Sequence, residues 1–287
     1  MPADTCDNAM VIFDVLKRSV ELVYISDTPS LDIEVLLCHV LRKDRSYLYT
    51  WPDQRLTNSQ QVHFDGLFRQ RLNGKPVAYI TKKREFWSLE FKVSPITIIP
   101  RPETELLVEK ALSFPFGHQI SVLDLGTGTG AVALALASEK PLWKITAVDI
   151  ELDAVELAEA NRQRFDFDNV CIYQSDWFSG IKSTQFDLIV TNPPYISPKD
   201  EHLKIGDVRF EPSSALVSKD DGLSDIHTII YNANSHLKFC GWLMMEHGYD
   251  QGKVVRQKMT QAGFSDVRTF TDLSGLERVS ACSKGGP

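Results

Sequence analysis

The tetrapeptide Asn192-Pro193-Pro194-Tyr195 contains residue types that could hold a planar NH₂ group. Proline fixes φ and has no backbone N–H, so this run offers carbonyls as acceptors only. The Asn192 side-chain oxygen and the Pro193 carbonyl could accept the two N–H protons, while Tyr195 stacks on the planar group. We therefore predict catalytic roles for Asn192, Pro193 and Tyr195, and substrate binding by the whole tetrapeptide. A plain proline-rich loop after a strand is the simpler alternative.

A glycine-rich run over 124–130 indicates a second site, for a cofactor. Glycines let the backbone turn tightly and approach a ligand, and the helix N-terminus that follows suits an anionic group. The spacing Gly126-x-Gly128-x-x-Ala131 also satisfies the dinucleotide fingerprint, so the glycines alone leave a nicotinamide cofactor open. The predicted cofactor ligands in this run are Asp124, Gly126, Thr127, Gly128, Thr129 and Gly130.

Acidic and aromatic residues beside this run favour S-adenosylmethionine. The Asp124 carboxylate would repel a pyrophosphate but could accept from the ammonium group of S-adenosylmethionine, which has no phosphate. Asp149 ends the next predicted strand and could bind both ribose hydroxyls, as it could in a nicotinamide enzyme. Asp176 and Trp177 follow a third strand and could bracket the adenine, although Trp177 also suits a packed core. We predict S-adenosylmethionine as cofactor, S-adenosylhomocysteine as its product, and no metal.

The nitrogen of a planar amide is a poor nucleophile, because its lone pair is delocalised into the carbonyl group. The strength of this delocalisation shows in the rotational barrier of the C–N bond, ~18–20 kcal/mol. Two fixed acceptors would polarise the N–H bonds and aim the nitrogen at the methyl group. Alignment of bound reactants is worth ~7–11 kcal/mol. Because the sulfonium already activates the methyl group, no general base is needed before transfer. The alkylated nitrogen can then lose a proton to water or to a nearby carboxylate.

Alternating strands and helices must position these residues. Short apolar strands separated by helices predict a mostly parallel, doubly wound α/β sheet. We expect strands at Ser121–Leu125, Lys144–Asp149, Val170–Gln174, Phe186–Thr191 and 241–246, with an antiparallel pair at 267–270 and 278–282. We expect helices at 103–112, Ala131–Glu139, 152–164 and 224–237.

The residues before this pattern indicate helices only. Apolar spacing predicts helices over 9–22 and 31–41, the second with Ser30 as its N-cap. A third helix is expected to start near Thr57-Asn58, to run to Leu72 and to stop at Gly74. Residues 86–93 and 96–99 are β-branched and aromatic around Ser94-Pro95, which predicts a β-hairpin. The expected domains are a helical N-terminal domain over 1–75, a β-hairpin linker over 76–100 and a methyltransferase domain over 101–287.

Composition and charge narrow the class of protein. The 287 residues are 43% hydrophobic and 24% charged, as in ordinary globular proteins, and the net charge is −7. Because nucleic-acid binding depends on neutralising phosphates, this acidic total disfavours a nucleic-acid substrate. The apolar run 131–137 is far shorter than the ~18 residues of a membrane span. We expect a cytoplasmic protein whose scattered thiols form no metal site: Cys6, Cys38, Cys171, Cys240 and Cys282.

The chain resembles, over nearly its whole length, the PrmC/HemK family of release-factor glutamine N5-methyltransferases. The motifs that carry the resemblance are Arg84-Glu85-Phe86-Trp87-Ser88-Leu89, Ile99-Pro100-Arg101-Pro102-Glu103-Thr104-Glu105, the run 124–130, Ser175-Asp176-Trp177, Asn192 to Tyr195, Gly206-Asp207-Val208-Arg209-Phe210-Glu211-Pro212 and Glu246-His247-Gly248. Together they are highly specific, whereas adenine and cytosine amino-methyltransferases share the tetrapeptide alone.

The resemblance implies a five-helix-type N-terminal domain that docks the substrate, a hairpin linker and a class I methyltransferase domain. It implies methylation of the glutamine in the Gly-Gly-Gln motif of class-1 peptide chain release factors by a monomeric enzyme without direct nucleic-acid contact. In the family, the positions matching Gly126 to Gly130, Asp149, Trp177 and Asn192 bind the cofactor, and those matching Asn192 to Tyr195 hold the glutamine.

Three positions depart from the family pattern, and they concern turn geometry rather than chemistry. Lys82 stands where members often have glycine, Glu103 where aspartate is common, and Cys240-Gly241 replaces a usual Gly-Gly turn.

Some charged residues keep two interpretations. His247 favours a structural role at a strand end over chemistry. Asp207, Arg209 and Glu211 could contact the incoming release factor or order the segment after Tyr195.

Four other functions remain alternatives. Adenine-N6 methylation would require a basic target-recognition segment, which the sequence does not show, and a ribosomal-protein glutamine is a related protein target. The intact glycine and tetrapeptide motifs argue against a catalytically silent release-factor-binding module. A nicotinamide-dependent dehydrogenase is the fourth.

Overall fold

The computed structural model describes residues 10–182 and 184–285, which form two compact units. The helical unit comprises the chain up to Lys82 together with an inserted segment, Glu201–Phe210. The sheet unit comprises Lys83–Asp200 and the chain from Glu211 onward. Ala9, where the first predicted helix begins, and Cys6 lie outside the described residues.

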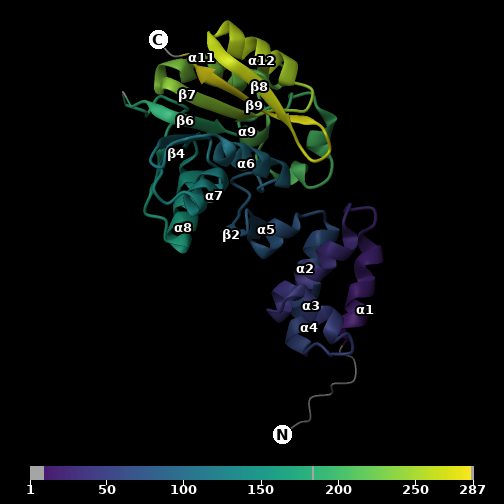
Figure 1. Cartoon of the computed structure of the whole chain (residues 1–287). Helices are drawn as coiled ribbons and strands as arrows, with labels where there is room; N and C mark the ends of the chain where they lie inside the picture. The colour runs from purple at the N-terminus through teal and green to yellow at the C-terminus, as the bar shows by residue number, and fades with distance from the viewer. Residues whose placement is uncertain (1–9, 183, 286–287) are drawn as a thin grey trace. The chain divides into compact units, whose positions relative to one another are not determined.

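The helical unit packs its helices around an apolar core of its own (Figure 1). The helices, in chain order, are α1 (Ile12–Lys17), the 3-10 helix η1 (Arg18–Leu22), α2 (Pro29–Leu41), α3 (Arg45–Thr50), α4 (Asn58–Leu72) and α5 (Val77–Thr81), with η3 (Glu201–Lys204) and η4 (Val208–Phe210) in the inserted segment. The predicted second and third helices are confirmed, whereas the first is α-helical only in its first part. The sequence pattern missed α3 and α5, because six and five residues are too few to show a helical period.

The starts of α2 and α4 are fixed in different ways. Thr57 forms a capping box with Gln60: its hydroxyl accepts from the Gln60 N–H at 3.2 Å, and its own N–H donates to the Gln60 side chain at 2.8 Å. The prediction of Ser30 as the N-cap of α2 is wrong. That helix begins at Pro29, and proline suits the first helical position because its φ is already helical and it has no N–H to satisfy.

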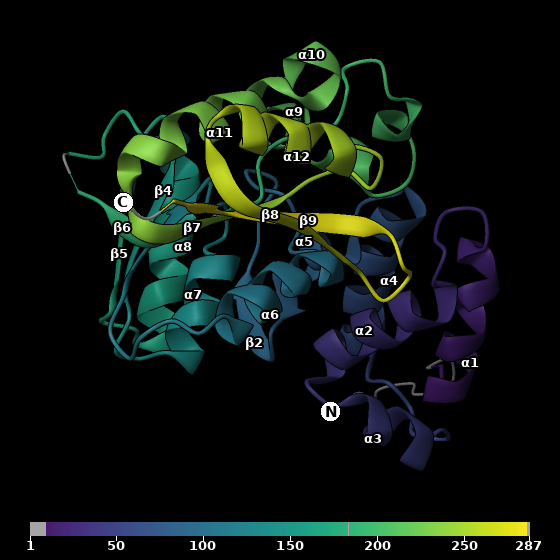
Figure 2. The ribbon, with the colours of Figure 1, turned by 45° about the horizontal axis from the view of Figure 1, so that its top comes forward.

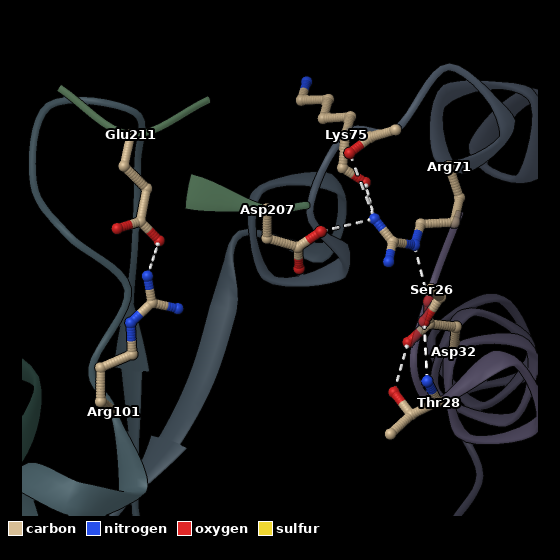
Figure 3. Close-up of polar contacts among 9 residues, drawn as sticks. Ser26, Thr28, Asp32, Arg71, Lys75, Arg101, Asp207 and Glu211 are labelled. Carbon is tan, nitrogen blue, oxygen red and sulfur yellow. Dashed lines mark hydrogen bonds and ion pairs between the residues drawn. The ribbon is translucent and has the colours of Figure 1, made fainter. Parts of the chain in front are cut away.

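Buried Arg71, on α4, joins three parts of the helical unit (Figure 3). Its Nε donates to the Asp32 carboxylate of α2 at 2.6 Å, and its Nη1 donates to the Asp207 carboxylate at 2.8 Å. The same Nη1 lies 3.2 Å from the carbonyl oxygens of Gly74 and Lys75. One guanidinium therefore attaches the inserted segment to the helices, across 136 positions of sequence.

The sheet unit opens with the hairpin of β1 (Lys83–Phe86) and β2 (Leu89–Lys92). It turns at Trp87 and Ser88, whose φ values of +51° and +59° match the left-handed two-residue turns that fit strand twist. A hairpin is thus present, but the prediction that 96–99 forms a strand is wrong. The first residues of that stretch lie instead in a turn over 94–97, in which the Thr97 N–H donates to the Ser94 carbonyl at 3.3 Å.

Within the described residues, the large sheet has seven strands in the order β5-β4-β3-β6-β7-β9-β8. The strands are β3 (Ser121–Leu125), β4 (Lys144–Asp149), β5 (Val170–Gln174), β6 (Phe186–Thr191), β7 (Leu237–Glu246), β8 (Phe264–Thr271) and β9 (Glu277–Lys284). Strand β9 alone runs opposite to the other six, so the predicted doubly wound fold and its closing antiparallel pair are confirmed.

Helices cover both faces of this sheet (Figure 2). One face carries α6 (Glu105–Ser113), α7 (Ala131–Glu139) and α8 (Leu152–Phe165), and the other carries α11 (Ser224–His236) and α12 (Gly252–Gln261). The short helices η2 (Pro102–Thr104), α9 (Ser213–Leu216) and α10 (Lys219–Gly222) complete the unit. From β3 the chain moves to β4 and β5 on one side and then to β6 on the other, so the strand order reverses beside β3. Ligands of doubly wound sheets bind at such a reversal.

Two of the three departures from the family pattern lie at left-handed backbone positions. Lys82, at the C-cap of α5, and Cys240, within β7, both have φ near +60°. The strand also begins at Leu237, earlier than predicted, and its register against β6 shifts between Phe186 and Leu188. Lys82 and Cys240 thus both have a backbone conformation that glycine adopts at lower cost.

Replacing exposed Cys240 with glycine is expected to stabilise the protein by roughly 0.5–1 kcal/mol. A left-handed non-glycine residue costs roughly 1–2 kcal/mol, and the added freedom of glycine in the unfolded chain offsets part of the gain. Urea unfolding of Cys240→Gly against Cys240→Ala measures the effect, because alanine keeps the β-carbon. Equal stability of the two variants would contradict the expectation.

Candidate active site

A cavity of about 280 Å³ lies in the sheet unit where strands β3 to β6 end. Its walls include seven of the predicted site residues, namely Gly126, Gly128, Asp149, Asp176, Trp177, Asn192 and Pro194. A smaller adjoining cavity shares Gly126, Gly128 and Asn192 and adds Asp124, Thr127 and Thr129. Residues far apart in the sequence therefore meet at the carboxyl edge of the sheet, as expected for this fold.

The glycine run is shaped by backbone conformation and held by Asp149. Gly126 has a φ of +71°, and a β-carbon there would lie 3.3 Å from the Trp177 ring. The Asp149 carboxylate accepts from the Gly128 N–H at 2.8 Å and from the Glu151 N–H at 3.0 Å. Burial raises the pKa of Asp149, although these backbone donors oppose the shift. The aspartate predicted to bind ribose thus also fixes the loop beside it.

Asn161, a residue that the sequence pattern did not reveal, supports the far end of this loop. It is completely buried on α8. Its Nδ2 donates to the Thr129 carbonyl at 2.9 Å and to the Lys92 carbonyl at 3.0 Å, and its Oδ1 accepts from the Lys92 N–H at 2.8 Å. A lone asparagine on a helix carries no motif, so only the fold shows that it joins the glycine run to the hairpin.

Trp177 is held in an unusual backbone conformation beside the larger cavity. Its φ is +44°, and the Ser175 hydroxyl donates to its carbonyl at 2.8 Å while accepting from the Gly180 N–H at 2.9 Å. The ring also packs against the core of the sheet unit. Trp177 therefore both lines the cavity and packs against the core, so the two interpretations of this residue are compatible.

Asp124 lines the smaller cavity but is itself 2% exposed. Its Oδ2 accepts from the Thr127 hydroxyl at 2.7 Å. Burial raises the pKa of the Asp124 carboxyl to about 7, against the opposing hydrogen bonds from Thr127 and the Ala133 backbone. Contact of Asp124 with the cofactor ammonium stays a prediction. Gly130, the last residue of the run, lines neither cavity and instead serves as the N-cap of α7 with φ +84°.

The tetrapeptide follows β6 directly, and its two ends are fixed by side chains from other elements. The Asn192 Nδ2 donates to the Thr104 hydroxyl at 3.2 Å. The Tyr195 hydroxyl donates to Glu246 Oε1 at 3.1 Å, and the Tyr195 carbonyl accepts from Gln251 Nε2 at 2.9 Å. Asn192 and Pro194 line the larger cavity, whereas Pro193 and Tyr195 line neither cavity.

Glu246 and His247 end β7 beside this tetrapeptide. Burial raises the pKa of Glu246 to about 7, against lowering by the hydroxyls of Thr104 and Tyr195. His247 is completely buried, with its Nδ1 2.8 Å from the Gly248 carbonyl oxygen and its Nε2 2.8 Å from the Ser280 hydroxyl. Both ring nitrogens are thus engaged, one by the adjacent Gly248 and the other by Ser280 of β9, which fits the structural role favoured for His247.

The charged residues after Tyr195 are engaged within their own units (Figure 3). Asp207 binds Arg71 in the helical unit, and Arg209 stacks on Phe210 with its guanidinium carbon 5.0 Å from the ring centre. Glu211 is buried in the sheet unit and accepts from Arg101 Nη2 at 2.6 Å. Of the two interpretations, the contacts of Asp207 and Glu211 support the ordering of this segment.

Two further features of the described residues bear on the class of site. Histidine, cysteine and carboxylate side chains do not gather there into a group that could hold a metal ion. None of the helices in the described part of the chain has the length and apolar character to cross a membrane.

Family models match two stretches of the chain: "Methyltransferase small domain" over residues 102–238 and "PrmC N-terminal domain" over residues 20–81. The release factor glutamine methyltransferase of Shewanella oneidensis is 50% identical over 261 residues, covering 91% of each chain. That of Pseudomonas aeruginosa is 52% identical over 256 residues, covering 88% of this chain and 93% of the relative.

The fold also matches a solved structure. A methyltransferase from Pyrococcus furiosus aligns with a TM-score of 0.53 at 21% identity, covering 77% of this chain and 99% of the other, and this likeness supports the class I methyltransferase fold. The curated relatives are about half identical to this chain over nearly its whole length, which shows the family as well as the fold. This chain belongs to the release factor glutamine methyltransferase family.

Proposed function

We propose that this enzyme methylates the side-chain amide nitrogen of the glutamine in the Gly-Gly-Gln motif of class-1 peptide chain release factors, with S-adenosylmethionine as donor. The names of its relatives support the substrate. The observation that carries the chemistry is the fixed Asn192 amide, whose Nδ2 is engaged by Thr104 beside the cofactor cavity. Its Oδ1 is thereby left to accept from an NH₂ group of the substrate.

The cavity residues fit S-adenosylmethionine. Glycine suits position 126, because its φ is +71° and a β-carbon there would lie only 3.3 Å from the Trp177 ring, which provides a flat surface for an adenine. The Asp149 carboxylate can accept from ribose hydroxyls while it retains its backbone donors, because each oxygen has two lone pairs. Asp124 lines the smaller cavity, where a carboxylate suits the ammonium of the methionine part. When bound, the cofactor supplies an electrophilic methyl group on a sulfonium.

The residues of the tetrapeptide then orient the amide. Asn192 Oδ1 and the Pro193 carbonyl accept the two N–H protons, which fixes the direction of the nitrogen lone pair. Tyr195 packs on the amide plane, and burial beside Glu246 raises the pKa of its hydroxyl far above the usual range, so it stays neutral. The proton is released from nitrogen after methylation, because the neutral amide must first attack.

A labelled-cofactor assay tests the proposed function. The full chain is incubated with S-adenosylmethionine carrying a labelled methyl group and with a class-1 release factor, and peptide mass spectrometry locates the label. We expect one methyl group on the glutamine of the Gly-Gly-Gln motif. Equal labelling of a release factor with that glutamine replaced by alanine would reject the proposal.

We infer that the helical unit docks the release factor, that the enzyme is a monomer and that it works in the cytoplasm, where release factors act. A match to the family's N-terminal domain supports the docking role, and all residues of the two cavities belong to the sheet unit. The net charge of −7 supports a protein rather than a nucleic acid as substrate. A short Gly-Gly-Gln peptide should therefore be a much poorer substrate than the whole release factor, and equal kcat/KM values would contradict docking.

Trp177→Ala is expected to weaken S-adenosylmethionine binding by roughly 5-fold to 150-fold. Stacking of a base on an aromatic side chain is worth about 1–3 kcal/mol, which corresponds to that range. Isothermal titration measures the Kd. Trp87→Ala is the matched control, because Trp87 lies in the hairpin turn outside both cavities. An unchanged Kd in Trp177→Ala, or an equal loss in the control, would contradict the adenine site.

A further inference from the structure

A row of four polar side chains connects the two ends of the tetrapeptide inside the sheet unit. Asn192 Nδ2 donates to the Thr104 hydroxyl at 3.2 Å. The Thr104 hydroxyl in turn faces the Glu246 carboxylate and lowers its pKa as a hydrogen-bond donor. At the other end, the Tyr195 hydroxyl donates to Glu246 Oε1 at 3.1 Å. The row thus leads from the amide, through Thr104 and Glu246, to the tyrosine of the same motif.

The direction of each hydrogen bond follows from the ionised carboxylate, which can only accept. Because Thr104 gives its one proton to Glu246, its oxygen is free only to accept from Asn192. The nitrogen end of the Asn192 amide must therefore point at Thr104, and the oxygen end must point away. An asparagine amide is nearly symmetrical in shape, so without the hydroxyl its two orientations would differ little. Only one of them presents an acceptor to the substrate.

Glu246 occupies a costly position for a residue with no role beyond packing. It is 1% exposed, and its Oε2 has no hydrogen-bond partner among the described residues. A buried carboxylate without full compensation is unfavourable, and an apolar side chain of similar size is often as stable or more so. Glu246 is therefore better explained by what it holds in place than by stability.

We infer that Thr104 and Glu246 are positioning residues for methyl transfer, which hold the Asn192 oxygen and, through its hydroxyl, the Tyr195 ring in the orientation that receives the substrate amide. The inference rests on the proposed function and deepens it. Thr104 comes from the motif Ile99-Pro100-Arg101-Pro102-Glu103-Thr104-Glu105 and Glu246 from Glu246-His247-Gly248, which carried the family resemblance without a chemical role for either residue.

Thr104→Val and Thr104→Ser form a matched pair that tests this role. Valine keeps the shape of threonine without the hydroxyl, whereas serine keeps the hydroxyl. Loss of the hydroxyl leaves a buried polar group unpaired, so kcat on the release factor should fall about 10-fold to 100-fold in Thr104→Val. The Kd for S-adenosylmethionine should change less than about threefold, and Thr104→Ser should restore most of the turnover. Wild-type kcat in Thr104→Val, or equal losses in both variants, would overturn the inference.

A pH profile gives a second readout that a purely structural role would not move. The carboxylate accepts from Thr104 and Tyr195 only while it is ionised, and Arg278 and Glu103 act on it with opposite signs. Because burial raises the Glu246 pKa to about 7, kcat should fall as the pH drops below about 7. Glu246→Gln cannot ionise, so its kcat should be lower and should lack this inflection. An identical inflection in Glu246→Gln would count against the role of Glu246.

A third readout does not need turnover. Nitrogen-15 NMR of the folded full-length chain reports how strongly the Asn192 side-chain amide protons are protected from exchange. Protection should drop in Thr104→Val and return in Thr104→Ser, and unchanged protection in Thr104→Val would overturn the inference. If the wild-type enzyme labels no release factor, the proposed function fails by itself, and the NMR comparison still decides whether Thr104 orients Asn192.

Discussion

Asn192→Ala is expected to lower kcat for methylation of a release factor by about 10²–10³-fold, the loss seen when one fixed polar group is removed from a preorganised active site. The substitution removes the acceptor for one N–H proton of the substrate amide, and with it the alignment of the nitrogen. Asn192 also lines the larger cavity, in which we propose that the cofactor binds, so the Kd for S-adenosylmethionine should rise, but by less than about tenfold. Single-turnover kinetics with calorimetric Kd values separate the two effects.

Asn169→Ala is the matched control for this substitution. Asn169 lies in the same unit, and its Nδ2 donates to the carbonyls of Lys140 and Trp143 at 3.3 Å and 3.1 Å, away from both cavities. It therefore reports the cost of losing an asparagine for structural reasons alone. Near-normal turnover in Asn192→Ala, or an equal loss in Asn169→Ala, would undo the assignment of Asn192 as the residue that holds the substrate amide.

Arg71→Met is expected to destabilise the helical unit by about 3–5 kcal/mol, because it removes one partner of a buried ion pair and leaves the Asp32 carboxylate uncompensated. Asp207 loses its partner as well, but that carboxylate is 38% exposed and should contribute little. Of the five tryptophans, only Trp51 belongs to the helical unit. Urea unfolding followed by fluorine NMR of labelled tryptophans therefore reports the two units separately.

The double variant Arg71→Met, Asp32→Asn is the control for this prediction. It replaces both charges, so it should recover a large part of the lost stability. The tryptophans of the sheet unit should unfold at nearly the same urea concentration in all three proteins. A loss below about 1 kcal/mol at Trp51 in Arg71→Met would show that the buried guanidinium is not what holds this unit together.

The sequence was most informative where a pattern repeats or a motif is contiguous. Apolar strands between helices predicted β3 to β6 with their observed bounds, because buried parallel strands show as short apolar runs. The glycine run and the tetrapeptide were visible because several informative residues are adjacent. The hairpin turn was misplaced, because Trp87 and Ser88 are not usual residues for a left-handed turn and Ser94-Pro95 looked more suitable.

Residues that act through tertiary contacts were not predictable from local pattern. Thr104 and Glu246 meet near Asn192 although 142 positions separate them, and Asn161 reaches the glycine run from a helix that shows only ordinary amphipathic spacing. Sequence reasoning placed Asn192 first but also predicted catalytic roles for Pro193 and Tyr195, yet of the tetrapeptide only Asn192 and Pro194 line the larger cavity. Which face of the tetrapeptide is presented depends on the partners of its side chains, and these come from other elements.

The inserted segment Glu201–Phe210 limits how the helical unit can be exchanged between members of the family. It belongs to the helical unit by its contacts, yet the chain of the sheet unit enters and leaves it. A recombinant protein that took only its first 82 residues from another family member would keep Asp207 of this chain. That aspartate would then have to bind a helical unit of different sequence around position 71. The transferable module is thus discontinuous, and residues 1–82 and 201–210 should be inherited, or grafted, together.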